Sequence, residues 1–491
     1  MLRASFTLDP AFSIGELDRR LFGSFVEHLG RCVYSGIYEP GHPRADARGF
    51  RTDVLELTRE LGVTTVRYPG GNFVSGYRWE DGVGPHRPAR LDPAWRSIET
   101  NAFGLGEFAA WATKAGVEPM MAVNLGTRGV QEACDLLEYA NHPGGTALSD
   151  LRIEHGDAEP YGIRMWCLGN EMDGPWQTGH KSAAEYGSLA QQTAHAMRMI
   201  DPNLELVLCG SSNHEMPTFA AWESTVLEAA YDEVDYISLH AYYREEHGDP
   251  ATFLAAGSAM EDFVQDVVAT ADHVRARRKA RKRIMLSFDE WNVWYAGPGN
   301  DTWEKAPRIL ENVYNVTDAV AVGSMLIGLL RQSDRVRAAS QAQLVNVIAP
   351  IFTEPGGPAW RQTIFHPFAQ AARYGHGEVL RVEPVSPVAE TKGYGEAALL
   401  HATAVRNDER TTVFAVNRSL TEPMELQIDV RGIEAARVVS HEVLADADRF
   451  ATNTREHPDR VRPYEVTGAA IDGGRLTAVL PPLSWNVLHL S

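Results

Sequence analysis

The feature that most constrains the fold is a repeated alternation of short β-rich runs and amphipathic helical stretches between about residues 20 and 376. This alternation is typical of consecutive βα units, and nearly all-apolar runs indicate strands buried on both faces of a parallel sheet. Eight runs are strand candidates: Phe22–His28, Thr64–Gly70, Pro119–Leu125, Arg164–Asn170, Glu205–Ser211, Val234–Ala241, Arg283–Glu290 and Val336–Val345. Helical periodicity between them predicts helices such as Asp53–Leu61, Phe103–Lys114, Ala183–Ile200, Ala256–Ala280 and Thr317–Leu330.

Eight such units predict a (β/α)8 TIM barrel with long loops, and a doubly wound parallel sheet is the alternative. After about Gly377 the helical periodicity disappears, and short alternating runs separated by turn signals take over. These runs are Leu399–Val405, Thr411–Val416, Glu425–Val430, Arg437–Glu442, Leu476–Leu480 and Trp485–Leu490. We therefore expect an α/β chain with a barrel over residues 17–377 and a C-terminal antiparallel β-sandwich over residues 378–491. A strand near Arg3–Leu8, within residues 1–16, is expected to join the sandwich.

The charge of the chain disfavours two classes of partner. Its formal net charge is −19, whereas nucleic acids and anionic membranes bind cationic surfaces. One local exception, Arg275–Arg283, carries seven basic residues in nine positions. It follows a helical pattern, where cations face the negative end of the helix dipole, so a solvated helix end is favoured over a binding patch. No run approaches the roughly 18 consecutive apolar residues of a membrane span.

The four cysteines carry no recognisable chemistry. Cys32, Cys134, Cys167 and Cys209 are widely spaced and form no CxxC pair, so neither a zinc site nor a redox motif is indicated. The first sixteen residues lack the apolar segment and cleavage site of a secretory signal. Free thiols together with the missing signal predict a cytoplasmic protein.

Two glutamates follow apolar strands of the predicted barrel. The run Met165–Gly169 ends on Asn170 and Glu171, and the run Ile284–Phe288 ends on Asp289 and Glu290. Polar residues at the carboxyl ends of barrel strands are typical of catalytic sites. Two carboxylates at one rim can cleave a glycosidic bond, one by protonating the leaving oxygen and the other by attacking the sugar. Carboxylates held in salt bridges are the alternative, but two glutamates placed alike favour catalysis.

The segments around these glutamates closely resemble the α-L-arabinofuranosidases of glycoside hydrolase family 51. Six motifs carry the resemblance: WCLGNEMDGPWQTGHK (Trp166–Lys181), SFDEWNVWY (Ser287–Tyr295), RYPGGNF (Arg67–Phe73), NHPGGT (Asn141–Thr146), AQLVNVIAPI (Ala342–Ile351) and LPPLSWNVLHL (Leu480–Leu490). The resemblance covers essentially the whole chain, including the predicted sandwich. An Asn-Glu pair after a strand would alone indicate only the wider clan of barrel glycosidases.

The resemblance implies that Glu171 is the acid/base and Glu290 the nucleophile, in agreement with their places at strand ends. It also implies a furanose pocket built, motif by motif, from Glu27, Arg67, Asn72, Asn170, His240, Tyr242 and Gln343. In that pocket Arg67 would fix the nucleophile, and Asn170 would contact the 2-hydroxyl, where hydrogen bonds strengthen in the transition state.

Other readings of single residues stay open. His240 and Tyr242 could be structural, but both lie at the end of a predicted strand, which favours the pocket. Trp95 and Trp176 could stack on sugar or pack within loops. Gly70 and Gly71 are better explained by a tight turn than by contact with a ligand.

The implied activity is retaining exo-hydrolysis of terminal non-reducing α-L-arabinofuranosyl residues from arabinan- or arabinoxylan-derived oligosaccharides. An endo-acting β-glucanase or xylanase would use the same two carboxylates. A carbohydrate-binding protein on an inactive barrel is disfavoured because both carboxylates are present. No HExxH, DxDxDG or clustered His/Cys motif occurs, so neither a metal nor another cofactor is expected. The resemblance also implies a homo-oligomer, specifically a hexamer, whereas linkage preference stays open.

Overall fold

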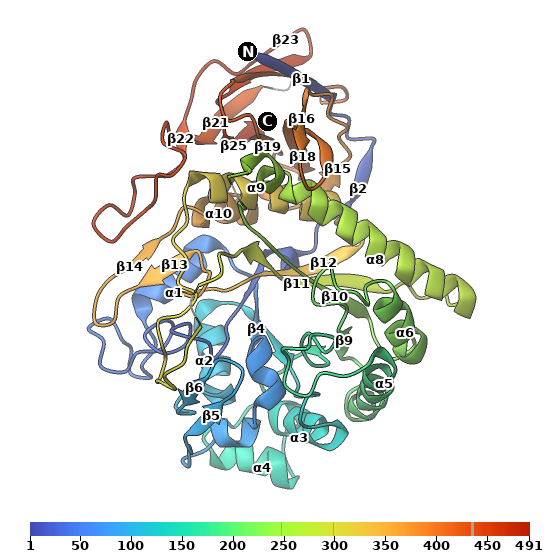
Figure 1. Cartoon of the computed structure of the whole chain (residues 1–491), viewed down its shortest axis with the longest axis vertical. Helices are drawn as coiled ribbons and strands as arrows, with labels where there is room; N and C mark the ends of the chain where they lie inside the picture. Colours follow the sequence, from blue (N-terminus) through green and yellow to red (C-terminus); the bar gives the residue numbers. More distant parts are fainter. Residues whose placement is uncertain (247, 298, 434–436) are drawn as a thin grey trace.

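The computed structural model, which describes residues 1–246, 248–297, 299–433 and 437–491, contains a closed barrel of eight parallel strands (Figure 1). Each strand pairs in parallel with the next, and the last closes against the first. In chain order they are β3 (Gly23–Phe25), β4 (Thr65–Tyr68), β7 (Glu118–Ala122), β8 (Met165–Cys167), β9 (Glu205–Leu208), β10 (Tyr236–Tyr243), β11 (Met285–Val293) and β12 (Val336–Gln341). The predicted (β/α)8 barrel is confirmed, and the doubly wound alternative is wrong.

Helices surround the barrel, and the five that were predicted by range are all present (Figure 1). They are α1 (Thr52–Leu61), α2 (Leu105–Ala115), α5 (Ala183–Ile200), α8 (Ala256–Arg278) and α9 (Val316–Arg331). The others are α3 (Val130–Asn141), α4 (Ala147–Glu154), α6 (Ala221–Ala230), α7 (Pro250–Leu254) and α10 (Phe365–Tyr374). Local sequence explains their ends: Ser182 caps α5 by accepting from the backbone N–H of Glu185, and Gly62 ends α1 in a left-handed conformation. The basic run at the carboxyl end of α8 pairs with acids, as in the Arg278–Asp232 ion pair.

Six of the eight predicted strands extend beyond the carboxyl ends of the observed strands, the first and the fourth among them. The first ends at Phe25 and the fourth at Cys167, so Glu27 and Glu171 lie on the loops that follow. The chain leaves β8 because Gly169 adopts a left-handed φ of +96°, which breaks the extended backbone. Apolar residues continue beyond the hydrogen-bonded part of each strand because the rim is also buried, and burial alone does not mark a strand end.

The carboxyl-terminal part of the chain forms two packed sheets (Figure 1). One has the order β1-β20-β24-β23 and the other β2-β15-β18-β19-β25-β21-β22. Their strands are β1 (Leu2–Thr7), β2 (Ser13–Glu16), β15 (Glu378–Leu380), β18 (Leu400–Arg406), β19 (Thr411–Asn417), β20 (Met424–Asp429), β21 (Val438–Leu444), β22 (Tyr464–Glu465), β23 (Ala470–Asp472), β24 (Arg475–Leu480) and β25 (Ser484–Leu490). Alternate residues of both sheets meet in one apolar core, including Phe6, Leu426, Ala402 and Leu488. The predicted C-terminal β-domain is confirmed.

One strand pair departs from the antiparallel pattern. β1 runs parallel to β20, with Leu2 opposite Met424, whereas the other pairs in these two sheets are antiparallel. The parallel pair arises because β1 enters from the far end of the chain rather than through a hairpin, so no tight turn imposes an antiparallel direction.

The sandwich packs directly on the barrel through α9, in which all residues but the last are buried. Gly323 of α9 lies against Trp485 of β25, and a methyl group at Gly323 would approach within 2.5 Å of the indole. The indole N–H of Trp485 donates to Gln370 of α10 at 2.9 Å. Apolar contact and a satisfied buried donor therefore fix the two parts against each other.

Candidate active site

Glu171 and Glu290 meet at the carboxyl-terminal rim of the barrel. Glu290 is part of β11, and Glu171 lies in the loop after β8. Glu171 is 8% exposed and Glu290 is 5% exposed. One oxygen of each glutamate and one imidazole nitrogen of His240 lie within 4.8 Å of one another. The expected convergence of strand ends thus places both carboxylates close enough to act on one bond.

Glu290 is held by two donors. The guanidinium of Arg67, from β4, donates to Oε1, and the hydroxyl of Tyr242, from β10, donates to Oε2 at 2.8 Å. Arg67 also donates to the side chain of Asn170 at 3.1 Å. Burial alone would lower the pKa of Arg67, but the carboxylates of Glu290 and Asp289 raise it. This pair therefore keeps a positive charge fixed beside Glu290.

Glu171 is hydrogen-bonded to a different set of residues from Glu290. Its Oε1 lies 2.9 Å from Nδ1 of His240, and its Oε2 accepts the indole N–H of Trp176 at 2.7 Å. Burial raises the pKa of Glu171, and the hydrogen bond from His240 partly opposes that rise. The backbone of Glu171 is left-handed, with a φ of +45°, a strained conformation that clusters at functional sites. A raised pKa favours the protonated carboxyl that an acid catalyst needs.

His240 bridges two carboxyl groups. Its Nε2 lies 2.9 Å from Oδ1 of Asp289, opposite the contact with Glu171. Burial would lower the pKa of His240, but the charge of Glu290 and the hydrogen bonds to Asp289 and Glu171 raise it well above its usual range. Each ring nitrogen faces a carboxyl oxygen, an arrangement that favours the protonated imidazole, in which both nitrogens donate.

A third buried carboxylate, Glu27, forms the other side of the pocket. It accepts three hydrogen bonds, from the backbone N–H of Phe73 at 2.9 Å, the indole of Trp95 at 2.9 Å and the amide of Gln343 at 2.8 Å. Burial raises the pKa of Glu27 to about 7, and the bonds from Phe73 and Trp95 oppose this rise. Asn72 joins the same group, since it accepts a long hydrogen bond of 3.4 Å from Asn170.

Two glycines let the backbone approach these carboxylates. Gly70 has a φ of +109°, and a Cβ there would lie 2.2 Å from Cβ of Glu27. A Cβ on Gly71 would lie 3.2 Å from oxygens of both Glu27 and Glu290. The turn after β4 therefore requires residues without side chains.

The two tryptophans that the sequence left open both donate to site carboxylates. Trp95 lies in the loop of a hairpin formed by β5 (Arg90–Asp92) and β6 (Ser97–Glu99), and Trp176 is 48% exposed. The sequence suggested sugar stacking or loop packing for these two residues. Neither role includes the hydrogen bonds that their indoles donate to Glu27 and Glu171.

All nine residues proposed from sequence gather at this rim, and one neighbour was missed. Asp289 is buried between His240 and Cys167, whose thiol lies 3.6 Å from it. A register irregularity between Phe288 and Trp291 of β11 lets both Asp289 and Glu290 reach the rim. The strand-end pattern contained the signal, because Asp289 follows the apolar run directly.

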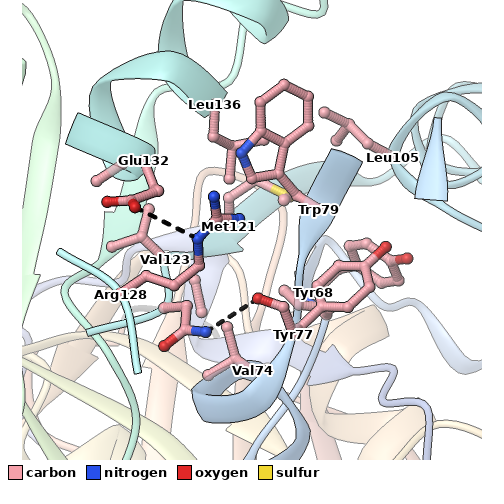
Figure 2. A pocket seen from close by; sticks show the side chains of 14 residues that line it. Tyr68, Val74, Tyr77, Trp79, Leu105, Met121, Val123, Arg128, Glu132 and Leu136 are labelled. Carbon is pink, nitrogen blue, oxygen red and sulfur yellow. Dashed lines mark hydrogen bonds and ion pairs between the residues drawn. The ribbon is translucent and has the colours of Figure 1, made fainter. Parts of the chain in front are cut away.

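A small cavity behind the turn after β4 is separate from this site. It holds about 20 Å³, is lined by residues such as Tyr68, Val74, Tyr77, Met121 and Leu136, and is edged by the Arg128–Glu132 ion pair (Figure 2). That volume accommodates about one water molecule, far less than a pentose.

Comparisons with known proteins identify the family that this chain resembles. The α-L-arabinofuranosidase C-terminal domain model matches residues 289–484, and the α-L-arabinofuranosidase 1 domain model matches residues 57–255. An intracellular exo-α-(1→5)-L-arabinofuranosidase of Streptomyces lividans is 64% identical over 100% of this chain and 75% of its own length. A relative of the same description from Halalkalibacterium halodurans is 53% identical, over 100% and 99% of the two chains.

Solved structures of α-L-arabinofuranosidases also resemble this chain over its full length. A family 51 α-L-arabinofuranosidase from Bifidobacterium longum superposes with a TM-score of 0.96 at 47% identity, and each chain is covered completely. Because identity and fold agree over the full length, the chain belongs to the α-L-arabinofuranosidases of glycoside hydrolase family 51.

Proposed function

We propose that this exo-α-L-arabinofuranosidase acts with retention, with Glu290 as nucleophile and Glu171 as acid/base. The observation that carries this proposal is the approach of one oxygen of each carboxylate to within 4.8 Å of the other. Retaining glycosidases place their carboxyl groups about 5–5.5 Å apart, whereas inverting enzymes need about 6.5–9.5 Å to admit a water molecule. The separation therefore supports direct attack on the sugar by a carboxylate.

In the first step Glu290 attacks the anomeric carbon while Glu171 gives its proton to the departing oxygen, which keeps the electron pair of the broken bond. The product is a covalent glycosyl-enzyme. In the second step Glu171, now ionised, takes a proton from a water molecule whose oxygen attacks the anomeric carbon and releases Glu290. Arg67 and Tyr242 hold the nucleophile in one orientation through both steps.

The remaining residues bind the sugar. Glu27, Asn72, Asn170 and Gln343 present oxygen and nitrogen atoms that can pair with ring hydroxyls. The hydrogen bond from Trp95 to Glu27 ties the β5–β6 hairpin to this wall. Because the hairpin closes one side of the pocket, we expect the pocket to hold one terminal sugar residue, as exo action requires. An endo-acting glucanase or xylanase, which needs a cleft open at both ends, is therefore disfavoured.

Two variants test the assignment of roles. Glu290→Ala removes the nucleophile, so turnover is lost, and added azide restores a product of inverted configuration because the small anion fills the gap. Glu171→Ala spares 2,4-dinitrophenyl α-L-arabinofuranoside, whose leaving group needs little protonation. Proton NMR of the released glycosyl azide gives its configuration. Exchange of the two phenotypes would overturn the assignment.

For substrates, we propose short oligosaccharides derived from arabinan or arabinoxylan. Relatives named intracellular exo-α-(1→5)-L-arabinofuranosidases support this class and a cytoplasmic location. A relative from Bifidobacterium longum at 54% identity is named an exo-α-(1→6)-L-arabinofuranosidase, so linkage must be measured on defined oligosaccharides. In the described part of the chain, no helix combines the length and apolar character needed to cross a bilayer.

Two structural proposals accompany the function. Residues 17–377 form the catalytic domain, and residues 378–491 with the first sixteen form the sandwich, as supported by the pairing of β1 with β20 and of β2 with β15. The homo-oligomer implied by family resemblance stays a prediction, which light scattering coupled to gel filtration would test.

A further inference from the structure

Asp289 is a buried carboxylate whose role the proposed mechanism leaves unassigned. It is 2% exposed and lies next to the nucleophile in sequence. Among the described residues its side chain has two partners, with Oδ1 facing Nε2 of His240 at 2.9 Å and Oδ2 facing the thiol of Cys167 at 3.6 Å. Asp289 is therefore linked to the catalytic carboxyl of Glu171 by its hydrogen bond with His240.

The state of His240 decides where the proton of Glu171 lies. A protonated imidazole donates from Nδ1 to Oε1 of Glu171, so the acidic proton must reside on Oε2. A neutral imidazole that donates to Asp289 would instead present a lone pair at Nδ1. The proton of Glu171 would then lie on Oε1 and point into the protein, away from a leaving group.

The geometry identifies Oε2 as the productive oxygen. It accepts the indole N–H of Trp176 at 2.7 Å, and Trp176 is half-exposed. Oε1 faces buried His240. A proton delivered to a bound glycoside must therefore leave from Oε2.

Charge pairing shows why Asp289 is needed. The groups around His240 come from four places: Arg67 on β4, Glu171 and Asp173 after β8, Tyr242 on β10, and Asp289 and Glu290 on β11. Arg67 forms an ion pair with Glu290, and Asp173 is held by Ser212. Burial raises the pKa of the Tyr242 hydroxyl, which stays neutral. Glu290 also lies 3.6 Å from Nδ1 of His240 but is shared with Arg67, so Asp289 is the counter-ion that hydrogen-bonds to Nε2, and without it the imidazolium would lose a buried partner charge.

We propose that Asp289 is a positioning residue for proton transfer, because it holds His240 as the imidazolium that covers Oε1 of Glu171 and so keeps the acidic proton on Oε2. This inference rests on the proposed role of Glu171 as the acid. It assigns to Asp289 no contact with substrate.

The test is Asp289→Asn, which keeps shape and removes charge, assayed on aryl α-L-arabinofuranosides from 2,4-dinitrophenyl to phenyl. Loss of directed proton transfer should lower kcat/KM for the phenyl glycoside by about tenfold to a hundredfold, within the range of general acid catalysis. The dinitrophenyl glycoside should change by less than about threefold, because its departure needs little protonation. An equal loss along the whole series, or no loss, would overturn the proposal.

Two control variants distinguish failure of the role proposed for Asp289 from failure of the acid role of Glu171. Asp173→Asn removes a nearby, partly buried carboxylate bound to Ser212 rather than His240, so any loss should be equal for all leaving groups. Glu171→Ala must show the leaving-group dependence by itself. If it does not, the acid assignment fails. If Glu171→Ala shows the dependence and Asp289→Asn does not, only the role of Asp289 fails.

A second measurement remains decisive if Asp289→Asn does not fold. In wild-type enzyme carrying ¹⁵N-labelled histidine, the His240 signals, assigned by their loss in His240→Gln, should show both ring nitrogens protonated at pH 7. A neutral imidazole at pH 7 would overturn the proposal.

Discussion

Trp95 donates its indole N–H to Oε1 of Glu27 across 2.9 Å, and this bond joins the β5–β6 hairpin to the wall of the sugar pocket. The other end of the hairpin is also anchored, because Glu99 lies 2.9 Å from Nδ1 of buried His28. Arg96 in the hairpin loop pairs with Asp301 at 2.5 Å. The position of the hairpin and the orientation of Glu27 are therefore coupled.

The first prediction concerns this bond. Trp95→Phe keeps an aromatic ring and removes the donor to Glu27, so sugar binding should weaken. Hydrogen bonds to charged groups contribute about 1.5–3 kcal/mol, which corresponds to roughly a tenfold to hundredfold fall in kcat/KM. Steady-state kinetics on 4-nitrophenyl α-L-arabinofuranoside should place most of the loss in KM. Trp111→Phe is the control, because the buried Trp111 indole has no hydrogen-bond partner among the described residues. Wild-type kinetics in Trp95→Phe would contradict the prediction.

The sequence predicted the parts of the site that strand order determines. Glu171, His240 and Glu290 follow apolar runs in the sequence, and parallel strands of a barrel end at one rim, so their meeting follows from the pattern alone. Trp95 was different. It lies 68 residues from Glu27, in a hairpin inserted between β4 and α2, and no periodic pattern links the two.

Two further details were not predicted, for physical reasons. The strand before Glu27 is shorter than its apolar run, because packing against neighbouring loops buries residues as effectively as sheet pairing does. Alternation along a regular strand would place the side chains of Asp289 and Glu290 on opposite faces, so the pattern does not predict that both reach the rim. The irregular register of β11 interrupts this alternation between Phe288 and Trp291.

The second prediction is the basic limb of the pH profile. Glu171 must be protonated for the first step, and burial raises its pKa, so activity falls as the pH rises through that raised value. Glu171→Gln assayed on the 2,4-dinitrophenyl glycoside should lose this limb, because no proton titrates at that position. A basic limb of unchanged position in the variant would remove the acid role of Glu171.

The third prediction uses Glu27, whose pKa burial raises to about 7. The ionised carboxylate accepts sugar hydroxyls, so ionised Glu27 is lost and KM should rise as the pH falls below about 7. Glu27→Gln should bind more weakly at every pH and should lose this part of the pH dependence of KM. A KM for the wild type that stays constant between pH 5 and 8 would contradict the prediction.

The fourth prediction is independence from metal ions. In the described part of the chain, the group of potential ligands close enough to hold an ion is Glu171, His240 and Glu290. These side chains already pair with Arg67, Asp289 and one another, which leaves no free set of ligands. Overnight EDTA followed by gel filtration should leave activity intact. Activity lost in this way and restored by a divalent ion would refute the expectation.

The fifth prediction concerns stability where the barrel meets the sandwich. His401 of β18 lies 2.7 Å from Glu261 of α8 through Nε2 and 2.9 Å from Ser324 of α9 through Nδ1. Burial, together with the charge of Arg418, lowers the pKa of His401 to about 4. In the unfolded chain a histidine has a pKa of about 6.5, so the unfolded state takes up the proton first as the pH falls.

The stabilisation from neutral His401 should therefore be complete above about pH 6.5 and should be lost progressively between about pH 6.5 and 4, with an upper bound of about 3 kcal/mol. Urea unfolding at pH 7.5 and at pH 5 should show a smaller free energy at the lower pH. His366 adds to this trend, since desolvation also lowers its pKa to about 4. His401→Gln isolates the contribution of one site, because it keeps a polar side chain without a titrating proton. Its loss of stability between the two pH values should be smaller than that of the wild type. Equal losses would show that the interface histidine does not set the acid sensitivity.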